Sequence, residues 1–175
     1  MLRALAFLGA LFFAMTSAQA ADPENTLYVD TDHGRITIAL MPDVAPKHVE
    51  RIKELVREGF YDGVVFHRVI PGFMAQTGDP TGTGTGGSDK PDLRAEFSRT
   101  AKFRRGTVGM ARTMDPNSAN SQFFIMFAPA PHLDGQYTIW GQVTEGMEAV
   151  DKIAKGEPPA NPDKMNKVSV AADVD

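Results

Sequence analysis

Hydrophobic and polar residues alternate over short stretches of this chain, with the two-residue period that is typical of β-strands. Between these stretches lie Gly, Pro, Asp and Asn, which favour turns, so each stretch predicts a separate strand. Residues 30–34 have the Asp and Gly expected of a hairpin connection, and the first two strands should therefore be antiparallel. The predicted strands cover residues 27–29, 35–40, 64–70, 106–112, 122–127 and 137–143, with a last strand around Val168 and Val170.

Two stretches show helical spacing instead. The first is expected to begin at Pro46, where the missing N–H costs nothing, and to run to about Glu58, before Gly59. Its apolar positions recur on one helical face, at Val49, Ile52, Leu55 and Val56. A second, short helix is expected over residues 147–154, ending at Gly156. Many short strands and two helices predict a mainly β fold, a closed barrel capped by the helices.

Residues 64–79 combine side chains that are unusual together in a core strand: an arginine, aromatic rings, a thioether and an amide. Strand alternation would place Arg68 on the same face as Phe66. The turn signal at Pro71 and Gly72 would then bring the following residues back towards the arginine. The stretch therefore predicts the wall of a pocket that contains Phe73, Met74 and Gln76. The alternative is an ordinary strand whose arginine lays its apolar stem along the protein surface.

The first twenty residues have the layout of a secretory signal peptide. A single cation, Arg3, precedes an uncharged apolar run, and Ala18-Gln19-Ala20 has the small residues of a cleavage site. A membrane anchor is the alternative, but the run is shorter than the roughly 20 residues that a span requires. We therefore expect residues 1–20 to be removed and residues 21–175 to form one domain without stable membrane insertion.

Composition excludes several classes of function. The chain has 18 Lys and Arg against 22 Asp and Glu, with both signs interspersed, which gives no reason to expect a nucleic-acid partner. It has no cysteine, so disulfides and thiolate chemistry are excluded. The four histidines lie in different predicted elements without the spacing of a metal site, and no metal is expected. Nothing in the sequence suggests a coiled coil, so a monomer is expected.

Residues 82–87 match the G-x-G-x-x-G pattern of dinucleotide-binding proteins. That site requires a strand before the glycines and a helix after them, and neither is predicted here. We interpret the segment as part of a long surface loop, and we expect no cofactor. A Gly-x-Ser-x-Gly elbow is also missing, so only the fold class leaves room for a secreted hydrolase.

Four segments of the chain resemble the cyclophilin family of peptidyl-prolyl cis–trans isomerases, in the same order and at nearly the same spacing. They are Phe66–Asp79, Gly82–Gly87, Ser121–Ile125 and Leu133–Gly135, and the resemblance spans about residues 26 to 172. It implies a closed eight-stranded antiparallel β-barrel with a helix at each end. It also implies a packed barrel interior and a binding groove on the outside.

The resemblance implies a role for individual residues. Arg68 would be the catalytic arginine, while Gln76 and Gln122 would hold the substrate backbone. The residues expected to bind substrate are Phe73, Met74, Ala111, Arg112, Phe124, His132, Leu133 and Tyr137, with Ala111 and Arg112 acting through their main chain. His132 and Tyr137 stand where many members of the family carry tryptophan and histidine. We therefore expect active turnover of peptides but weak binding of the inhibitor cyclosporin.

The chemistry gives this set of residues a physical meaning. Rotation about a peptide bond is opposed by a barrier of roughly 18–20 kcal/mol, because the nitrogen shares its lone pair with the carbonyl. A fixed guanidinium that donates to the prolyl nitrogen would stabilise the twisted amide more than the planar one. We therefore expect a prolyl isomerase that acts on flexible proline-containing polypeptides in the periplasm. The alternative is a non-catalytic proline-peptide binding module or holdase with the same groove.

Overall fold

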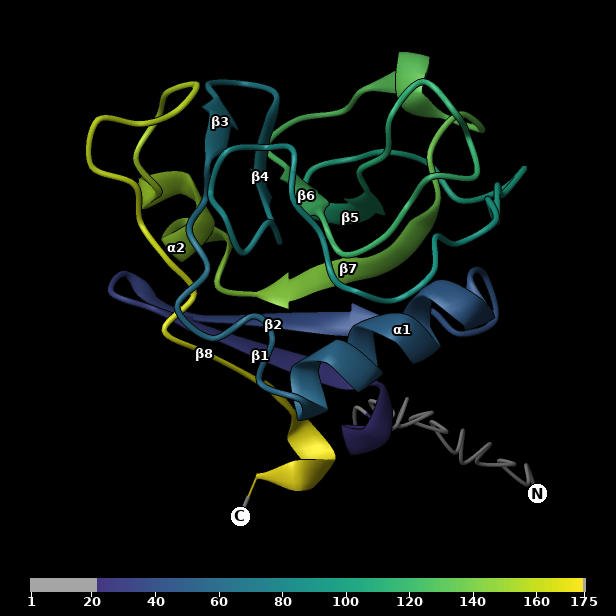
Figure 1. Ribbon diagram of the computed structural model, residues 1–175, viewed down its shortest axis with the longest axis horizontal. Coiled ribbons are helices and arrows are strands. Elements are labelled where there is room, and N and C mark those ends of the chain that lie inside the picture. The colour runs from purple at the N-terminus through teal and green to yellow at the C-terminus, as the bar shows by residue number, and fades with distance from the viewer. Residues whose placement is uncertain (1–21, 175) are drawn as a thin grey trace, which may run out of the picture.

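The computed structural model describes residues 22–174, so the predicted signal peptide and its cleavage site lie outside the described residues. Within this range the chain forms eight strands, two α-helices and short 3₁₀ helices (Figure 1). The strands are β1 (Thr26–Thr31), β2 (Gly34–Leu40), β3 (Arg68–Ile70), β4 (Met74–Thr77), β5 (Thr107–Met110), β6 (Phe123–Met126), β7 (Ile139–Glu145) and β8 (Lys167–Val170). The helices are α1 (Pro46–Arg57) and α2 (Met147–Lys152). No helix in this range is long and apolar enough to cross a membrane.

All eight strands belong to one antiparallel sheet, in the order β3-β4-β6-β5-β7-β2-β1-β8. Figure 1 shows the sheet folded over, with β3 to β6 in the upper half of the view and β1, β2, β7 and β8 below. Helix α1 packs against β8 and β7, and α2 packs against β2. The mainly β prediction with eight antiparallel strands and two helices is confirmed.

The expected closed barrel is wrong in one respect. Strands β3 and β8 are the two ends of the sheet order, and no ladder joins them within residues 22–174. The segment before β8 lies between these edges and makes single bridges, from Val65 to Lys164 and from Val69 to Gly156. The sheet is therefore a curled half-barrel whose open side is covered by an irregular segment, which also protects the β3 edge from pairing with other chains.

Side-chain alternation divides the apolar residues into two clusters. The larger fills the interior of the curled sheet and includes Trp140, which is fully buried. The smaller lies on the opposite, outer face of β4 and β6 and contains Met74 and Phe124. Because neighbouring residues of a strand point to opposite faces, Phe123 belongs to the inner cluster and Phe124 to the outer one.

Two local predictions are corrected by the structure. Residues 64–66 do not continue β3, because their backbone bonds to residues 163–165, and Phe66 donates to the carbonyl of Asp163 at 2.8 Å. Phe66 is consequently buried in the inner cluster with Val69, and does not share the face of Arg68. Residues 74–77, which were expected only to follow a turn, form β4 between β3 and β6. The predicted helix from Pro46 is confirmed to within one residue.

Candidate active site

The registers of four neighbouring strands place one row of residues side by side on the outer face of the sheet. Arg68 of β3 lies opposite Gln76 of β4, Gln76 lies opposite Phe124 of β6, and Phe124 lies opposite Gly109 of β5. Directly opposed residues on one face of an antiparallel pair are within contact distance of each other. The row therefore brings the predicted arginine, one glutamine and the predicted aromatic residue together.

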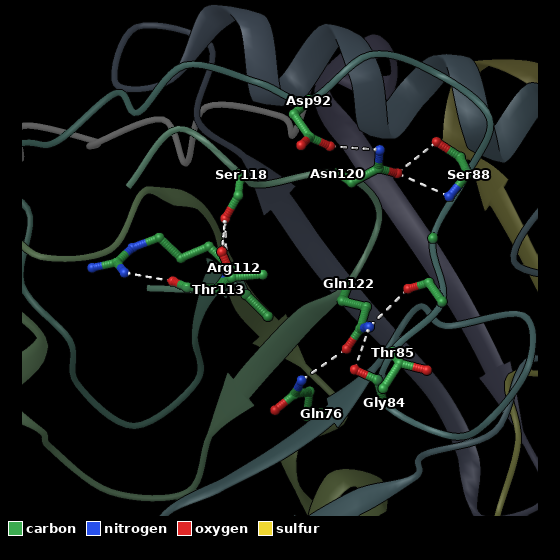
Figure 2. Close-up of a pocket in the computed structure, with 13 residues that line it drawn as sticks. Gln76, Gly84, Thr85, Ser88, Asp92, Arg112, Thr113, Ser118, Asn120 and Gln122 are labelled. Atoms are coloured by element: carbon green, nitrogen blue, oxygen red, sulfur yellow. Dashed lines mark hydrogen bonds between the residues drawn. The ribbon is translucent and has the colours of Figure 1, made fainter. Parts of the chain in front are cut away.

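A chain of hydrogen bonds runs across this row. Arg68 Nη1 donates to Gln76 Oε1 at 3.3 Å, and Gln76 Nε2 donates to Gln122 Oε1 at 2.9 Å. Gln122 Nε2 then donates to the carbonyls of Gly84 and Gly86 at 3.0 and 2.8 Å. Figure 2 shows the two glutamines pointing towards one another, with Gln122 also directed at the glycine-rich loop. The arginine and both amides are thus held in defined orientations before any substrate binds.

Beside this row lies a pocket of about 220 Å³ with polar side chains along its rim and an apolar floor, for which we call it the apolar pocket. Its floor is made of side chains that are almost fully buried, Met74, Phe124 and Leu133. Phe124 stacks on Phe103 with 5.7 Å between ring centroids and meets the edge of Tyr137 at 5.8 Å. The pocket is lined by nine residues, all predicted from the sequence: Arg68, Phe73, Met74, Gln76, Ala111, Arg112, Phe124, Leu133 and Tyr137.

A second hollow of about 480 Å³ adjoins the apolar pocket and shares Gln76, Ala111 and Arg112 with it. Its far wall is the glycine-rich loop, which the sequence interpretation treated only as a surface loop. Asn120 ties the end of this loop to the following segment, because its side-chain amide accepts hydrogen bonds from Ser88 and donates to Asp92 at 3.0 Å (Figure 2). Gln122, one of the predicted residues, also lines this hollow.

The buried carboxylate of Asp79 holds the glycine-rich loop in place. It accepts hydrogen bonds from the backbone of Thr81, Gly84 and Gly86 and from the hydroxyl of Thr81. Burial alone would raise the pKa of Asp79, but these donors outweigh it and lower the pKa to about 2. A side chain at Gly86 would collide with this carboxylate. The loop is therefore an ordered wall, and its carbonyls can fix Gln122.

Arg112 also contributes its side chain to the site, in addition to the main-chain role that the resemblance implies. Its guanidinium lies 4.4 Å from the centre of the Tyr137 ring, and its Nη2 donates to the carbonyl of Gln136 at 2.7 Å. The arginine and tyrosine therefore form one edge of the apolar pocket, and Arg112 also lines the second hollow.

His132 lies at the margin of the site. It belongs to a short 3₁₀ helix, Pro131–Leu133, is exposed, and does not line the apolar pocket. Its ring stacks on Phe73, with centroids 5.8 Å apart. Any influence of His132 on binding must therefore pass through Phe73 or through a ligand that extends beyond the pocket.

The sequence interpretation missed one charged contact of the site. Glu157 Oε1 accepts a hydrogen bond from Arg68 Nε at 2.8 Å, across 89 residues of chain. No sequence signal near Glu157 indicates this contact, because it depends on how the segment before β8 lies against β3. Within residues 22–174, no group of three or more His, Cys, Asp or Glu residues is arranged to hold a metal ion.

The family comparison identifies a relationship over nearly all of the described chain. The sequence model of the family described as cyclophilin type peptidyl-prolyl cis-trans isomerase matches residues 26–171. A probable peptidyl-prolyl cis-trans isomerase of Brucella suis is 55% identical over 188 residues, covering 98% of this chain and 95% of that protein. A peptidyl-prolyl cis-trans isomerase-like 1 of Aspergillus oryzae is 42% identical over 130 residues, covering 71% of this chain and 78% of that protein.

Solved structures agree with this relationship. A cyclophilin from Hirschia baltica superposes with a TM-score of 0.82 at 30% identity, covering 94% of this chain and 83% of that one. A cyclophilin-type isomerase of Cryptosporidium parvum, crystallised in the presence of the dipeptide Ala-Pro, superposes with a TM-score of 0.78 at 30% identity, covering 83% and 98%. Family, relatives and structural neighbours thus lead to one conclusion: this chain belongs to the cyclophilin-type peptidyl-prolyl cis–trans isomerases.

Proposed function

We propose that this isomerase turns X-Pro bonds in the groove formed by Arg68 and the apolar pocket, on flexible proline-containing polypeptides. One observation carries the proposal: the strand register sets Arg68, Gln76 and Phe124 side by side in the lining of a pocket of about 220 Å³. An apolar pocket with a few convergent polar groups is the usual form of a small-ligand site. A proline ring is apolar and compact, and it suits this floor of Met74, Phe124 and Leu133.

In this proposal Arg68 carries out the electrostatic part of the reaction. When the X-Pro bond twists, conjugation is lost and the lone pair returns to the prolyl nitrogen, which becomes a better hydrogen-bond acceptor. A guanidinium held beside the pocket donates to that nitrogen and stabilises the twisted amide more than the planar one. The arginine remains charged at every working pH, so no proton transfer is required.

The neighbouring hollow extends the groove for the rest of the polypeptide. A chain whose proline occupies the apolar pocket would place an adjacent side chain against the glycine-rich loop, with Gln76 and Gln122 between them. Holding the chain on one side of the X-Pro bond confines rotation to the other side. The presence of the dipeptide Ala-Pro in crystals of the Cryptosporidium parvum neighbour supports a proline-containing ligand here.

The direct test is the cis–trans exchange rate of short X-Pro peptides, measured by NMR with and without residues 21–175. Uncatalysed exchange takes tens of seconds or longer, so catalysis is readily detected. Acceleration that is lost in Arg68→Ala supports the proposal. A protein that binds the peptides but leaves their exchange rate unchanged would be the binding module or holdase instead.

We also propose that the protein acts outside the cytoplasm, in the periplasm, as a monomer. The layout of residues 1–20 supports export. X-Pro isomerisation is slow enough to limit the folding of exported proteins, so a catalyst of this step would be useful in the periplasm. N-terminal sequencing of protein from the cell envelope should find Ala21 as the first residue, and sedimentation should give a single-chain mass. A retained Met1 in the membrane fraction would contradict cleavage.

A further inference from the structure

The segment that covers the β3 edge carries an acidic residue directly opposite Arg68. Val69 and Gly156 exchange two backbone hydrogen bonds, of 2.8 and 2.9 Å, in an antiparallel bridge. Moving one residue along each chain from this bridge pairs Arg68 with Glu157. Figure 1 shows this part of the C-terminal region, in yellow, beside β3. Glu157 is therefore set against the arginine by backbone pairing, independently of its own side chain.

The backbone conformation at this bridge requires a glycine. Gly156 has a φ of +149°, a conformation that residues with a side chain rarely adopt. A Cβ at this position would lie 2.6 Å from Pro159 Cα and 2.8 Å from the carbonyl oxygen of Pro158. The glycine thus allows a close turn that holds Glu157 at a defined point along β3.

The carboxylate and one glutamine hold the guanidinium from two sides. Glu157 accepts from Nε at 2.8 Å, and Gln76 accepts from Nη1 at 3.3 Å. Within residues 22–174 these are the guanidinium's two hydrogen bonds, so three of its five N–H groups, one on Nη1 and two on Nη2, remain free to donate to a ligand in the groove. Arginine has a long side chain with large rotamer entropy, so two anchors at different nitrogens orient its plane far better than one.

We infer that Glu157 is a positioning residue of the isomerase: it orients the guanidinium of Arg68 so that its free N–H groups can donate to the prolyl nitrogen. The inference rests on the proposed catalytic role of Arg68. It goes beyond the family resemblance, because Glu157 lies outside every segment that carries that resemblance. Glu157 acts through Arg68 and is not expected to touch the substrate.

The solvent exposure of the Arg68–Glu157 ion pair distinguishes a positioning role of Glu157 from a role in stabilising the fold. The side chains of Arg68 and Glu157 are 42% and 54% exposed, and exposed ion pairs contribute little to the stability of a fold. Loss of Glu157 should therefore leave the melting temperature nearly unchanged. The same loss frees one edge of the guanidinium, and we expect kcat/KM to fall about threefold to tenfold, mainly through kcat.

The experiment compares four variants with the wild-type protein in the X-Pro exchange assay. Glu157→Ala removes the acceptor, whereas Glu157→Gln keeps an oxygen that can accept from Nε but removes the charge. Asp151→Ala is the matched control, because its pair with Arg105 is similarly exposed, at 45% and 47%, and neither residue lines the groove. Arg68→Ala tests the function on which the inference depends. Unfolding of each variant is followed by the fluorescence of Trp140, the single tryptophan, which is fully buried.

The expected pattern is a lower kcat in Glu157→Ala, recovery to within about twofold of wild type in Glu157→Gln, and wild-type kinetics in Asp151→Ala. Wild-type or faster turnover in Glu157→Ala would overturn the inference, as would equal losses in the Ala and Gln variants, since the charge and not the orientation would then matter. If Arg68→Ala is as active as the wild type, the proposed catalytic role of Arg68 fails as well. A loss in Arg68→Ala without one in Glu157→Ala removes only the role of Glu157.

Discussion

Gly109 lies under the aromatic floor of the proposed proline pocket, and a single methyl group there should move that floor. A Cβ at Gly109 would lie 2.6 Å from Phe103 Cε1 and 2.8 Å from Phe124 Cζ. Both contacts are with side chains, so the strand itself need not break. Because the two rings stack on one another, a shift of Phe124 towards the pocket is the available response in Gly109→Ala.

The size of the effect follows from these distances. Carbon atoms in contact are about 3.5 Å apart, so the rings must move by about 0.7–0.9 Å. Overpacking a well-packed apolar cluster costs roughly 1–3 kcal/mol of stability. A displaced floor should also weaken the grip on the proline ring by about 1–2 kcal/mol, which corresponds to an increase in KM of roughly fivefold to thirtyfold.

Gly141 provides a matched control on the inner face of the sheet. A Cβ there would lie 2.8 Å from Ile38 Cγ2, within the inner cluster and away from the groove. We therefore expect Gly141→Ala to lower the melting temperature to a similar extent but to leave KM unchanged. KM and kcat are measured with an X-Pro peptide series, and stability is measured by urea unfolding followed by Trp140 fluorescence.

Two results would refute this reasoning. A native KM in a folded Gly109→Ala protein would mean that Phe124 does not define the pocket floor, or that Phe103 alone yields. An equal rise of KM in Gly141→Ala would mean that loss of stability in general, and not displacement of Phe124, weakens binding.

Three further predictions concern charge and specificity. Arg68→Ala should lower kcat/KM by about 10²–10³ with the fold intact, which is the size expected for the loss of one transition-state donor. Arg68→Lys should be nearly as inactive, because the point charge of an ammonium group does not reproduce the planar guanidinium. Near-native turnover of the lysine variant would show that a positive charge alone suffices. The lowered pKa of Asp79 contributes stability that is complete above its unfolded pKa and is lost as the pH falls from about 4 to about 2. The free energy of unfolding, measured in urea, should therefore drop by about 2 kcal/mol more over this pH window in the wild type than in Asp79→Asn. An equal dependence of the unfolding free energy on pH in the two proteins would contradict the assignment. His132→Trp should bind cyclosporin more tightly in a competition assay with little change in peptide turnover, since the ring contacts Phe73 but not the pocket, and equal inhibitor affinity in both proteins would refute a role for His132.

The sequence by itself determined the elements whose information is local. The helix from Pro46 followed from its apolar spacing and from a proline at its first turn, and both were confirmed. Most strands were predicted because alternation between two faces requires no knowledge of the partner strand. The resemblance then identified a set of residues of which nine line one pocket, because motif residues can be named without knowing how they are brought together.

The tertiary structure alone decided what depends on pairing between distant segments. Phe66 turned to the inner cluster because residues 64–66 bond to residues 163–165, a partner that no periodicity near Phe66 reveals. The carbonyls of Gly84 and Gly86 accept hydrogen bonds from Gln122 because the Asp79 carboxylate binds the backbone N–H groups of the same two glycines and so fixes the loop. Glu157 reached Arg68 because a single backbone bridge fixes the register between two segments 89 residues apart. Local patterns set which face a side chain occupies, but the register between remote segments sets which side chains meet.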